Sequence, residues 1–213
     1  MYLSRVILDH RKRETMRALS YPEMIHGAIE HSISYSEHRN LWRIDKLNGY
    51  YNLLILSEKL PDLQSIHDQF GIEDRLPESR DYDKLLQNIE DNQVFRFRLK
   101  ANPVKSSAVD SNGGRGKIYA HVSTEQIAKW LLDRSSSNGF FLDRNGFKVM
   151  DCRWYRFMKS SRDNTARNNV TIKTATFEGI LKVSNSKLFM EALMNGIGRG
   201  KAYGCGLMTI MKK

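Results

Sequence analysis

The sequence has few cysteines and no long apolar run. Its 213 residues include two cysteines, Cys152 and Cys205, which have no metal-binding spacing and are too few for a disulfide framework. No apolar stretch reaches the roughly 18 residues that a membrane-spanning helix needs, and the N-terminus lacks a signal-peptide layout. We therefore expect a soluble, cytoplasmic protein with reduced cysteines and no membrane anchor.

Several catalytic signatures are also missing. Lys201 is followed by Ala202, so the phosphate-binding pattern GxxxxGK[ST] is absent, which argues against a nucleoside triphosphatase. The nucleophile elbow GxSxG and the zinc pattern HExxH do not occur. Asp143, Asp151 and Asp163 are separated by strand and turn positions and form no evident metal cluster. The sequence thus predicts no metal, no cofactor and no small-molecule substrate.

Positive charge, in contrast, is in excess. The chain has 34 Lys and Arg against 24 Asp and Glu, a formal net charge of +10. Such a surplus points to a polyanion, with nucleic acid first and an anionic membrane surface second. Basic residues interleaved with aromatics on strands favour RNA, which offers bases for stacking and phosphates for pairing; the alternative is a solvated face of an antiparallel sheet. The residues concerned are Arg96, Phe97, Arg98, Lys100, Arg153, Trp154, Tyr155, Arg156 and Lys159.

A glycine-rich stretch lies near the C-terminus. Five glycines fall between Gly196 and Gly206, with Arg199 and Lys201 among them. Glycine reaches positive φ without steric cost, and successive amides in such a loop can form a concavity for phosphate. A helical pattern at 188–194 precedes the loop and a strand pattern at 207–210 follows it. The alternative is a helix C-cap and turn that binds no ligand.

The first half of the chain has most of a ferredoxin-like pattern, β-α-β-β-α. Its hairpin is signalled by Asn48-Gly49, and Ser20 with Glu23 forms an apparent capping box at a helix start. The segment 71–92 is polar, with a hint of a short helix and a weak or missing final strand. The elements expected are a strand at 2–8, a charged loop at 9–16, a helix from 20–23, strands at 41–46 and 50–56, and a helix at 61–70.

The second half gives β-α-β-β-α-β. We therefore expect an α+β protein of two tandem ferredoxin-like (RRM-like) domains with antiparallel sheets, at 1–92 and 93–213, although no sequence repeat relates them. The elements expected are an alternating strand at 94–100, a basic loop at 104–117, a strand at 118–122, a helix at 127–132 capped by Ser123 and Gln126, a linker at 135–139, strands at 140–148 and 150–160, a polar turn at 163–169, a strand at 170–183 that Gly179 can break, a helix at 185–195 and a last strand at 207–210.

His26 is the candidate catalytic side chain. Ile25, Ile29 and Ile33 form an apolar stripe at helical spacing, and His26 lies about 60° from its centre at roughly 100° per residue. The histidine therefore stands at the border between core and solvent, where a neutral imidazole can act as acid or base near neutral pH. The alternative is a core-edge histidine without a chemical role.

Four motifs together resemble one protein family. They are Tyr2-Leu-Ser-Arg-Val-Ile7, Phe97-Arg-Leu-Lys-Ala-Asn-Pro-Val-Lys105, Phe177-Glu-Gly-Ile-Leu181 and the glycine stretch Gly196–Leu207. In this order they are similar to the CasE family, the CRISPR repeat-processing endoribonucleases of the subtype I-E Cascade complex. The resemblance spans nearly the whole chain.

The resemblance implies two ferredoxin-like domains and metal-independent cutting of precursor CRISPR RNA at the 3′ base of the repeat stem-loop. The 2′-OH attacks the adjacent phosphorus, which gives a 2′,3′-cyclic phosphate and a 5′-OH. The protein then stays bound to its product, with other Cascade subunits as partners. A non-catalytic RNA-binding structural subunit on the same fold is the alternative.

The resemblance also implies site residues. The family's catalytic histidine falls on His26. A tyrosine found three positions before it in some members falls on Glu23, and the nearest tyrosine, Tyr21, lies about 140° away around the helix, so its part in catalysis stays open. A basic hairpin that enters the RNA groove falls on about 153–173. The expected RNA-binding residues are Arg98, Lys100, Asn102, Lys105, Arg153, Arg156, Lys159, Arg162, Arg167, Gly198, Arg199, Gly200 and Lys201.

Overall fold

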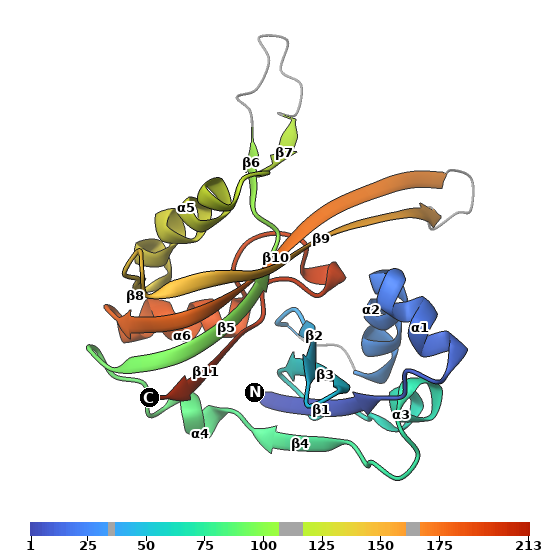
Figure 1. Cartoon of the computed structure of the whole chain (residues 1–213). Helices are drawn as coiled ribbons and strands as arrows, with labels where there is room; N and C mark the ends of the chain where they lie inside the picture. Colours follow the sequence, from blue (N-terminus) through green and yellow to red (C-terminus); the bar gives the residue numbers. More distant parts are fainter. Residues whose placement is uncertain (34–36, 107–116, 161–166) are drawn as a thin grey trace.

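Two antiparallel β-sheets, one from each half of the chain, form the framework of the protein (Figure 1). The computed structural model describes residues 1–33, 37–106, 117–160 and 167–213. Helices pack against both sheets, so the chain is an α+β protein with antiparallel sheets, as predicted.

The N-terminal sheet has the strand order β2-β3-β1-β4. Its hairpin turns at Asn48 and Gly49, both at positive φ as the sequence predicts. One apolar cluster joins this sheet to helices α1, α2 and α3. The elements are β1 (Tyr2–Leu8), α1 (Arg13–Ser20), α2 (Pro22–Ser32), β2 (Leu41–Leu47), β3 (Tyr50–Ser57), α3 (Gln64–Phe70), β4 (Glu78–Asp81) and α4 (Asp83–Leu86).

Three expectations for this half need correction. The segment 9–16 is not all loop, because α1 begins at Arg13. Ser20 does not cap α2: it is the last residue of α1, and Tyr21 is the N-cap of α2 without a side-chain cap bond. The fourth strand is present as β4, an exposed edge strand that pairs with β1.

The C-terminal sheet has the order β11-β5-β10-β8, with β9 paired to β10. Helix α5 begins at a capping box of Ser123 and Gln126, as predicted. The elements are β5 (Val94–Ala101), β6 (Val104–Ser106), β7 (Ile118–Ala120), α5 (Thr124–Ser135), the 3₁₀ turn η1 (Ser136–Asn138), β8 (Phe140–Phe141), β9 (Phe147–Ser160), β10 (Arg167–Val183), α6 (Ser186–Asn195), the 3₁₀ turn η2 (Lys201–Tyr203) and β11 (Met208–Lys212).

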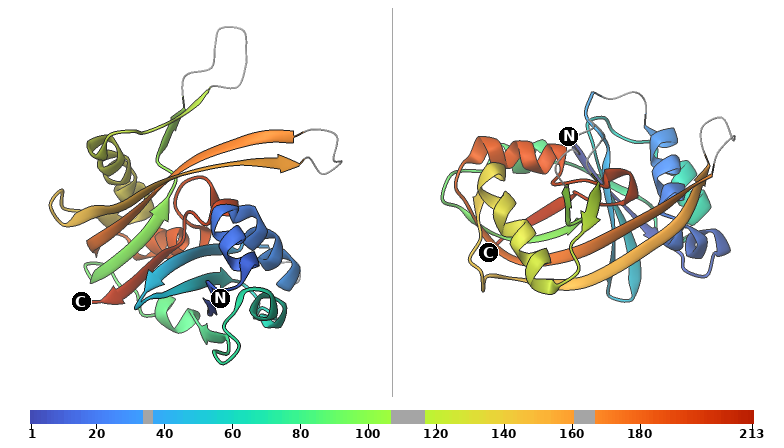
Figure 2. Two further views of the ribbon diagram at one scale, coloured as in Figure 1. Left: turned by 45° about the vertical axis from the view of Figure 1, so that its right-hand side comes forward. Right: turned by 90° about the horizontal axis from the view of Figure 1, so that it is seen from above.

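Two details of the long strands differ from the prediction. The first predicted strand of this region shrinks to β8, because Asp143 accepts bonds from the amides of Asn145 and Gly146 and turns the chain. Strand β10 is not broken at Gly179; a Cβ there would lie 2.5 Å from the backbone of Phe147, so glycine permits close pairing with β9. Together β9 and β10 form a long ribbon that runs out from the sheet toward α2 (Figures 1 and 2).

Buried Arg43 of β2 joins the two sheets. Its guanidinium donates to Asp45 at 2.8–3.1 Å, to the carbonyl oxygens of Arg98 and Leu207 at 2.8 and 2.9 Å, and to Thr209 Oγ1 at 2.7 Å. The larger apolar cluster likewise contains residues of both halves, among them Leu41, Leu56, Tyr82, Phe95, Phe97 and Leu207. The halves therefore share one interior.

None of the helices in the described part of the chain is long and apolar enough to cross a membrane.

Candidate nucleic-acid interface

Helix α2 holds His26 at the edge of the core. Pro22 occupies the first turn, where its missing N–H costs nothing, and Ile25 and Ile29 are buried against the N-terminal sheet. The side chain of His26 is 31% exposed, and its Nδ1 lies 3.9 Å from Glu30 Oε1, one turn further along. The border position predicted from the spacing is thus confirmed, and a carboxylate stands beside the imidazole.

Tyr21 lies just before the first turn of α2, so its predicted angle around the helix does not apply. Its ring meets Phe157 of β9 edge-on, with centroids 6.4 Å apart. Phe157 in turn meets Tyr203 of the glycine loop at 5.4 Å, also edge-on. We call Tyr21, Phe157 and Tyr203 the aromatic trio. It joins the start of the histidine helix, the long ribbon and the glycine loop at one place.

Tyr203 belongs to η2, which lies next to the histidine helix α2. The pKa of the Tyr203 hydroxyl is raised above the usual value, mainly by burial and further by the nearby carboxylate of Glu23. Glu23 precedes His26 by three residues on α2, so the two share a helix face. Helix α2 also packs against η2, which contains Tyr203. The family resemblance places a tyrosine of some members at position 23, where this chain has Glu23. Tyr203 of η2 instead brings a tyrosine side chain near this part of α2.

The glycine loop is built as a self-bonded turn. All five of its glycines have positive φ. The amide of Ile197 donates to Gly206, that of Cys205 to Gly200, and that of Gly206 to the carbonyl of Lys100 in β5 at 2.7 Å. These three amides are therefore bonded within the protein and are not free to bind a phosphate. A phosphate contact would fall instead on 198–202, the part that carries Arg199 and Lys201.

Two cations of this region, Lys201 and Arg39, influence each other electrostatically. The pKa of Lys201 is lowered, first by burial and second by the positive charge of Arg39. Like charges held close to each other are unfavourable unless an anion compensates them. Since Arg39 follows α2 in the chain and Lys201 begins η2, the pair lies where the histidine helix meets the loop. The arrangement suits a phosphate group.

The long ribbon presents basic and aromatic side chains as predicted. Arg153 and Arg156 are exposed, and Arg153 Nε donates to Asp151 at 2.9 Å. Trp154 is 48% exposed, with the ammonium group of Lys173 5.5 Å from its ring. Arg162 lies outside the described residues, and for Lys159 and Arg167 the structure describes the backbone alone.

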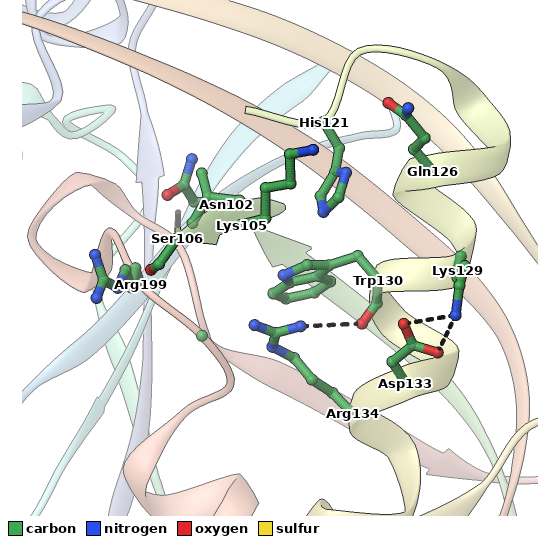
Figure 3. A pocket seen from close by; sticks show the side chains of 12 residues that line it. Asn102, Lys105, Ser106, His121, Gln126, Lys129, Trp130, Asp133, Arg134 and Arg199 are labelled. Carbon is green, nitrogen blue, oxygen red and sulfur yellow. Dashed lines mark hydrogen bonds and ion pairs between the residues drawn. The ribbon is translucent and has the colours of Figure 1, made fainter. Parts of the chain in front are cut away.

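Four predicted RNA-binding residues come together around a pocket of about 440 Å³ (Figure 3). They are Asn102, Lys105, Gly198 and Arg199. Asn102 is itself buried and donates to the carbonyl oxygen of Lys173 at 2.7 Å, so its side chain amide holds β5 to β10. Helix α5 supplies the opposite wall of the pocket.

The other two predicted residues of β5 lie outside this pocket. Arg98 is engaged by Asp45 at 3.4 Å and Glu178 at 3.0 Å, between the two sheets. Lys100 Nζ bonds to the hydroxyl of Tyr155 at 3.3 Å and lies over its ring. Arg98 is therefore held by ion pairs between the two sheets, whereas Lys100 of β5 contacts Tyr155 at the base of the ribbon.

Motifs and spacing in the sequence did not single out Phe157, Tyr203 or the α5 wall of the pocket as site residues. Their proximity to His26 or to the glycine loop depends on contacts between distant segments. One local signal existed for Tyr203, since it stands inside the glycine-rich stretch.

Both cysteines are free: Cys152 is exposed, and Cys205 is buried. Burial raises the pKa of the Cys205 thiol to about 11.

Within residues 1–33, 37–106, 117–160 and 167–213, no three His, Cys, Asp or Glu side chains gather as ligands for a metal ion.

Comparison with known proteins gives a match over nearly the full chain. The family described as CRISPR associated protein matches residues 1–212. The CRISPR-associated endoribonuclease Cse3 of Thermus thermophilus is 26% identical over 220 residues, which cover 99% of this chain and 99% of the relative. The CRISPR system Cascade subunit CasE of Escherichia coli is 28% identical over 121 residues, 54% of this chain and 56% of the relative.

A solved structure has the same fold. The CRISPR endoribonuclease Cse3 bound to a 19-nucleotide RNA superposes with a TM-score of 0.80 at 23% identity, over 99% of this chain and 100% of that chain. Both sheets and the ribbon therefore belong to a known architecture.

Proposed function

Because the chain belongs to the Cse3/CasE family of CRISPR-associated proteins, we propose that it cleaves precursor CRISPR RNA at the 3′ base of the repeat stem-loop. One observation carries the proposal. The half-exposed His26 stands on a helix that packs against the cationic glycine loop, with the aromatic trio joining that helix, the loop and the basic ribbon.

The proposed reaction is an internal transesterification that needs no metal, since the nucleophile belongs to the RNA. The ribose 2′-oxygen bonds to the adjacent phosphorus as its proton leaves, and the bond to the 5′-oxygen breaks as that oxygen takes a proton. The products are a 2′,3′-cyclic phosphate and a 5′-OH. His26 performs one of these proton transfers, and Lys201 with Arg39 stabilises the negative charge of the phosphorane.

The proposed RNA surface has two parts. The first is the ribbon, which contributes Arg153, Arg156, Lys159, Arg162 and Arg167, together with Lys100 of the neighbouring strand β5. The second is the edge of the glycine loop at Gly198–Lys201 with Lys105. Phosphate contacts of this kind give affinity and position without reading sequence. Because such contacts do not depend on the bond that is cut, we further propose that the protein stays on its product as a subunit of Cascade in the cytoplasm.

We also propose that the chain consists of two ferredoxin-like units, at 1–92 and 93–213. The order β4-β1-β3-β2 in the first sheet and the order β11-β5-β10-β9 in the second support this, because each follows the split βαβ arrangement.

A single incubation tests the activity. The purified protein is mixed with its repeat RNA in EDTA, and the ends of the products are analysed. We expect cutting at the 3′ base of the stem, with 2′,3′-cyclic phosphate and 5′-OH ends. Tight binding without any cutting would instead favour a non-catalytic RNA-binding subunit.

A further inference from the structure

The pocket of about 440 Å³ between α5, β6 and the glycine loop has no part in the proposed cleavage step. We propose that it binds a backbone phosphate of single-stranded RNA that flanks the repeat stem, an inference that rests on the proposed function. A pocket of this volume takes a small ligand such as one nucleotide, whereas a duplex cannot enter it.

The pocket presents positive charge that is not neutralised from within. Lys105, Arg134 and Arg199 line it, and the acidic residue in its wall, Asp133, is held by Lys129 at 2.7 and 2.9 Å. Among the described residues, no carboxylate lies within ion-pair distance of Lys105, Arg134 or Arg199. Figure 3 shows these three residues on different segments that line the pocket, with the guanidinium of Arg199 at its outer edge.

Contacts with Trp130 fix the guanidinium of Arg134 at the pocket, where it can bind an anion. Its guanidinium lies 4.3 Å from the centre of the Trp130 ring, and its Nη1 is 3.4 Å from the Trp130 carbonyl oxygen. Burial lowers its pKa, but an arginine keeps its charge at any physiological pH. A planar guanidinium fixed on an indole ring retains donors for phosphate oxygens, with little rotamer entropy left to lose.

The remaining polar groups of the wall also favour an acceptor-rich ligand. The indole Nε1 of Trp130 is buried and has no acceptor among the described residues. His121 has a lowered pKa because of burial first, and then of Lys105 and Arg134, while Asp133 acts in the opposite direction. A bound phosphate would accept hydrogen bonds here and favour protonation of the imidazole.

RNA is a better occupant than an acidic peptide because the pocket continues the proposed RNA surface. Gly198 and Arg199 form its wall, and the next residues of the same loop, η2, pack against the histidine helix. Arg199 also pairs with Asn102 at the end of β5, next to Lys105. A strand that leaves the cleavage site along this loop therefore reaches the pocket.

The test compares three RNAs by fluorescence anisotropy: the stem-loop alone, and the stem-loop with a single-stranded flank on its 5′ or 3′ side. A 2′-deoxy nucleotide at the cleavage site keeps each RNA intact. We expect one flank to tighten binding to the unaltered protein. Arg134→Gln should weaken the binding of that flanked RNA about tenfold, the loss expected for one charge-assisted contact. Its affinity for the stem-loop without a flank should stay within about twofold of that of the unaltered protein.

Three further variants complete the design. Arg134→Lys keeps the charge but not the fork and should restore part of the gain. Arg80→Gln removes the same charge from the exposed edge strand β4 and should change nothing. Lys105→Gln should also reduce the gain in affinity that the flank provides. Because this variant leaves the contact between Arg134 and Trp130 intact, it still tests the pocket if Arg134→Gln fails to fold.

The two proposals fail in different ways. The pocket assignment alone is overturned if the repeat is cleaved but neither flank affects binding. It is also overturned if the flank effect survives both Arg134→Gln and Lys105→Gln. Binding of flanked RNA without cleavage overturns the enzymatic function alone. If Arg134→Gln spares RNA binding but weakens assembly with other Cascade subunits, the pocket is a protein contact and the assignment is wrong.

Discussion

The ring of Trp42 occupies the space that a side chain at Gly204 would need. A Cβ on Gly204 would lie 2.7 Å from Cζ3 of Trp42, and Gly204 has a φ of +74°. Trp42 is 2% exposed and lies on β2, in the opposite half of the chain. The glycine loop is thus seated on an indole ring of the other sheet.

We expect Gly204→Ala to destabilise the protein by about 2–4 kcal/mol, because left-handed backbone strain and overpacking add. Thermal unfolding measures this. Gly49→Ala is the matched control: Gly49 also has positive φ, but nothing lies within 4 Å of its Cβ position. That change should cost about 1–2 kcal/mol. Equal losses in the two variants would mean that the Trp42 contact is unimportant.

His26→Ala should abolish cleavage while repeat binding stays within a few fold, because we assign the imidazole to proton transfer. Single-turnover cleavage and a binding titration on the same RNA separate the two effects. A deoxyribose just 5′ of the scissile phosphate should also block cutting, because it removes the nucleophile. Rapid cutting of that RNA would rule out attack by the 2′-OH.

Tyr21→Phe should lose much less rate than His26→Ala. The ring contact with Phe157 survives in this variant, and the Tyr21 residue is 42% exposed. Tyr203→Phe should lose more, about tenfold, because Tyr203 is partly buried in η2, which packs against the histidine helix. Both are measured as single-turnover rates at saturating RNA. A loss for Tyr21→Phe as large as that for His26→Ala would assign that hydroxyl to the catalytic site.

Changing Lys159, Arg162 and Arg167 together to Ala should weaken stem-loop binding strongly. We expect the log-log salt slope to flatten by roughly two units, since each phosphate contact contributes somewhat under one. Binding of an unstructured RNA of equal length should change less. Arg80, Lys84 and Lys187, changed together to Ala, remove the same charge elsewhere and should leave the slope nearly unaltered. An unaltered slope in the ribbon variant would show that these residues form a solvated turn.

Elements with a strong local signal were predictable from the sequence. Strand β5 alternates between buried and accessible residues because one face packs on the core. The hairpin at Asn48-Gly49 and the cap of α5 follow from backbone preferences of single residues. Strand β4 has no apolar face to signal it, since all four of its residues are exposed and its stability comes from pairing with β1. Helix α1 buries only Thr15 and Ala18, so its charged sequence reads as a loop.

The site was predictable only in part, because most of its contacts join segments that are far apart in the sequence. His26 was marked by its place beside an apolar stripe, and the resemblance assigned its role. The rest of the site depends on tertiary contacts: Tyr203 comes from the far end of the chain, and Arg134 lines the pocket from a helix that lies outside the four family motifs. The self-bonded form of the glycine loop depends on its pairing with Lys100. Spacing along the sequence does not encode such partners.

The bonds from Arg43 to the carbonyl of Leu207 and to Thr209 have a consequence for synthesis on the ribosome. The first half of the chain emerges well before these partners do. Until the last strand arrives, Arg43 and the apolar residues Leu41, Leu56 and Tyr82 lack the surface that covers them in the folded protein. The nascent N-terminal half is therefore a candidate for chaperone binding, and the RNA site is assembled only after Leu207 and Thr209 have left the exit tunnel.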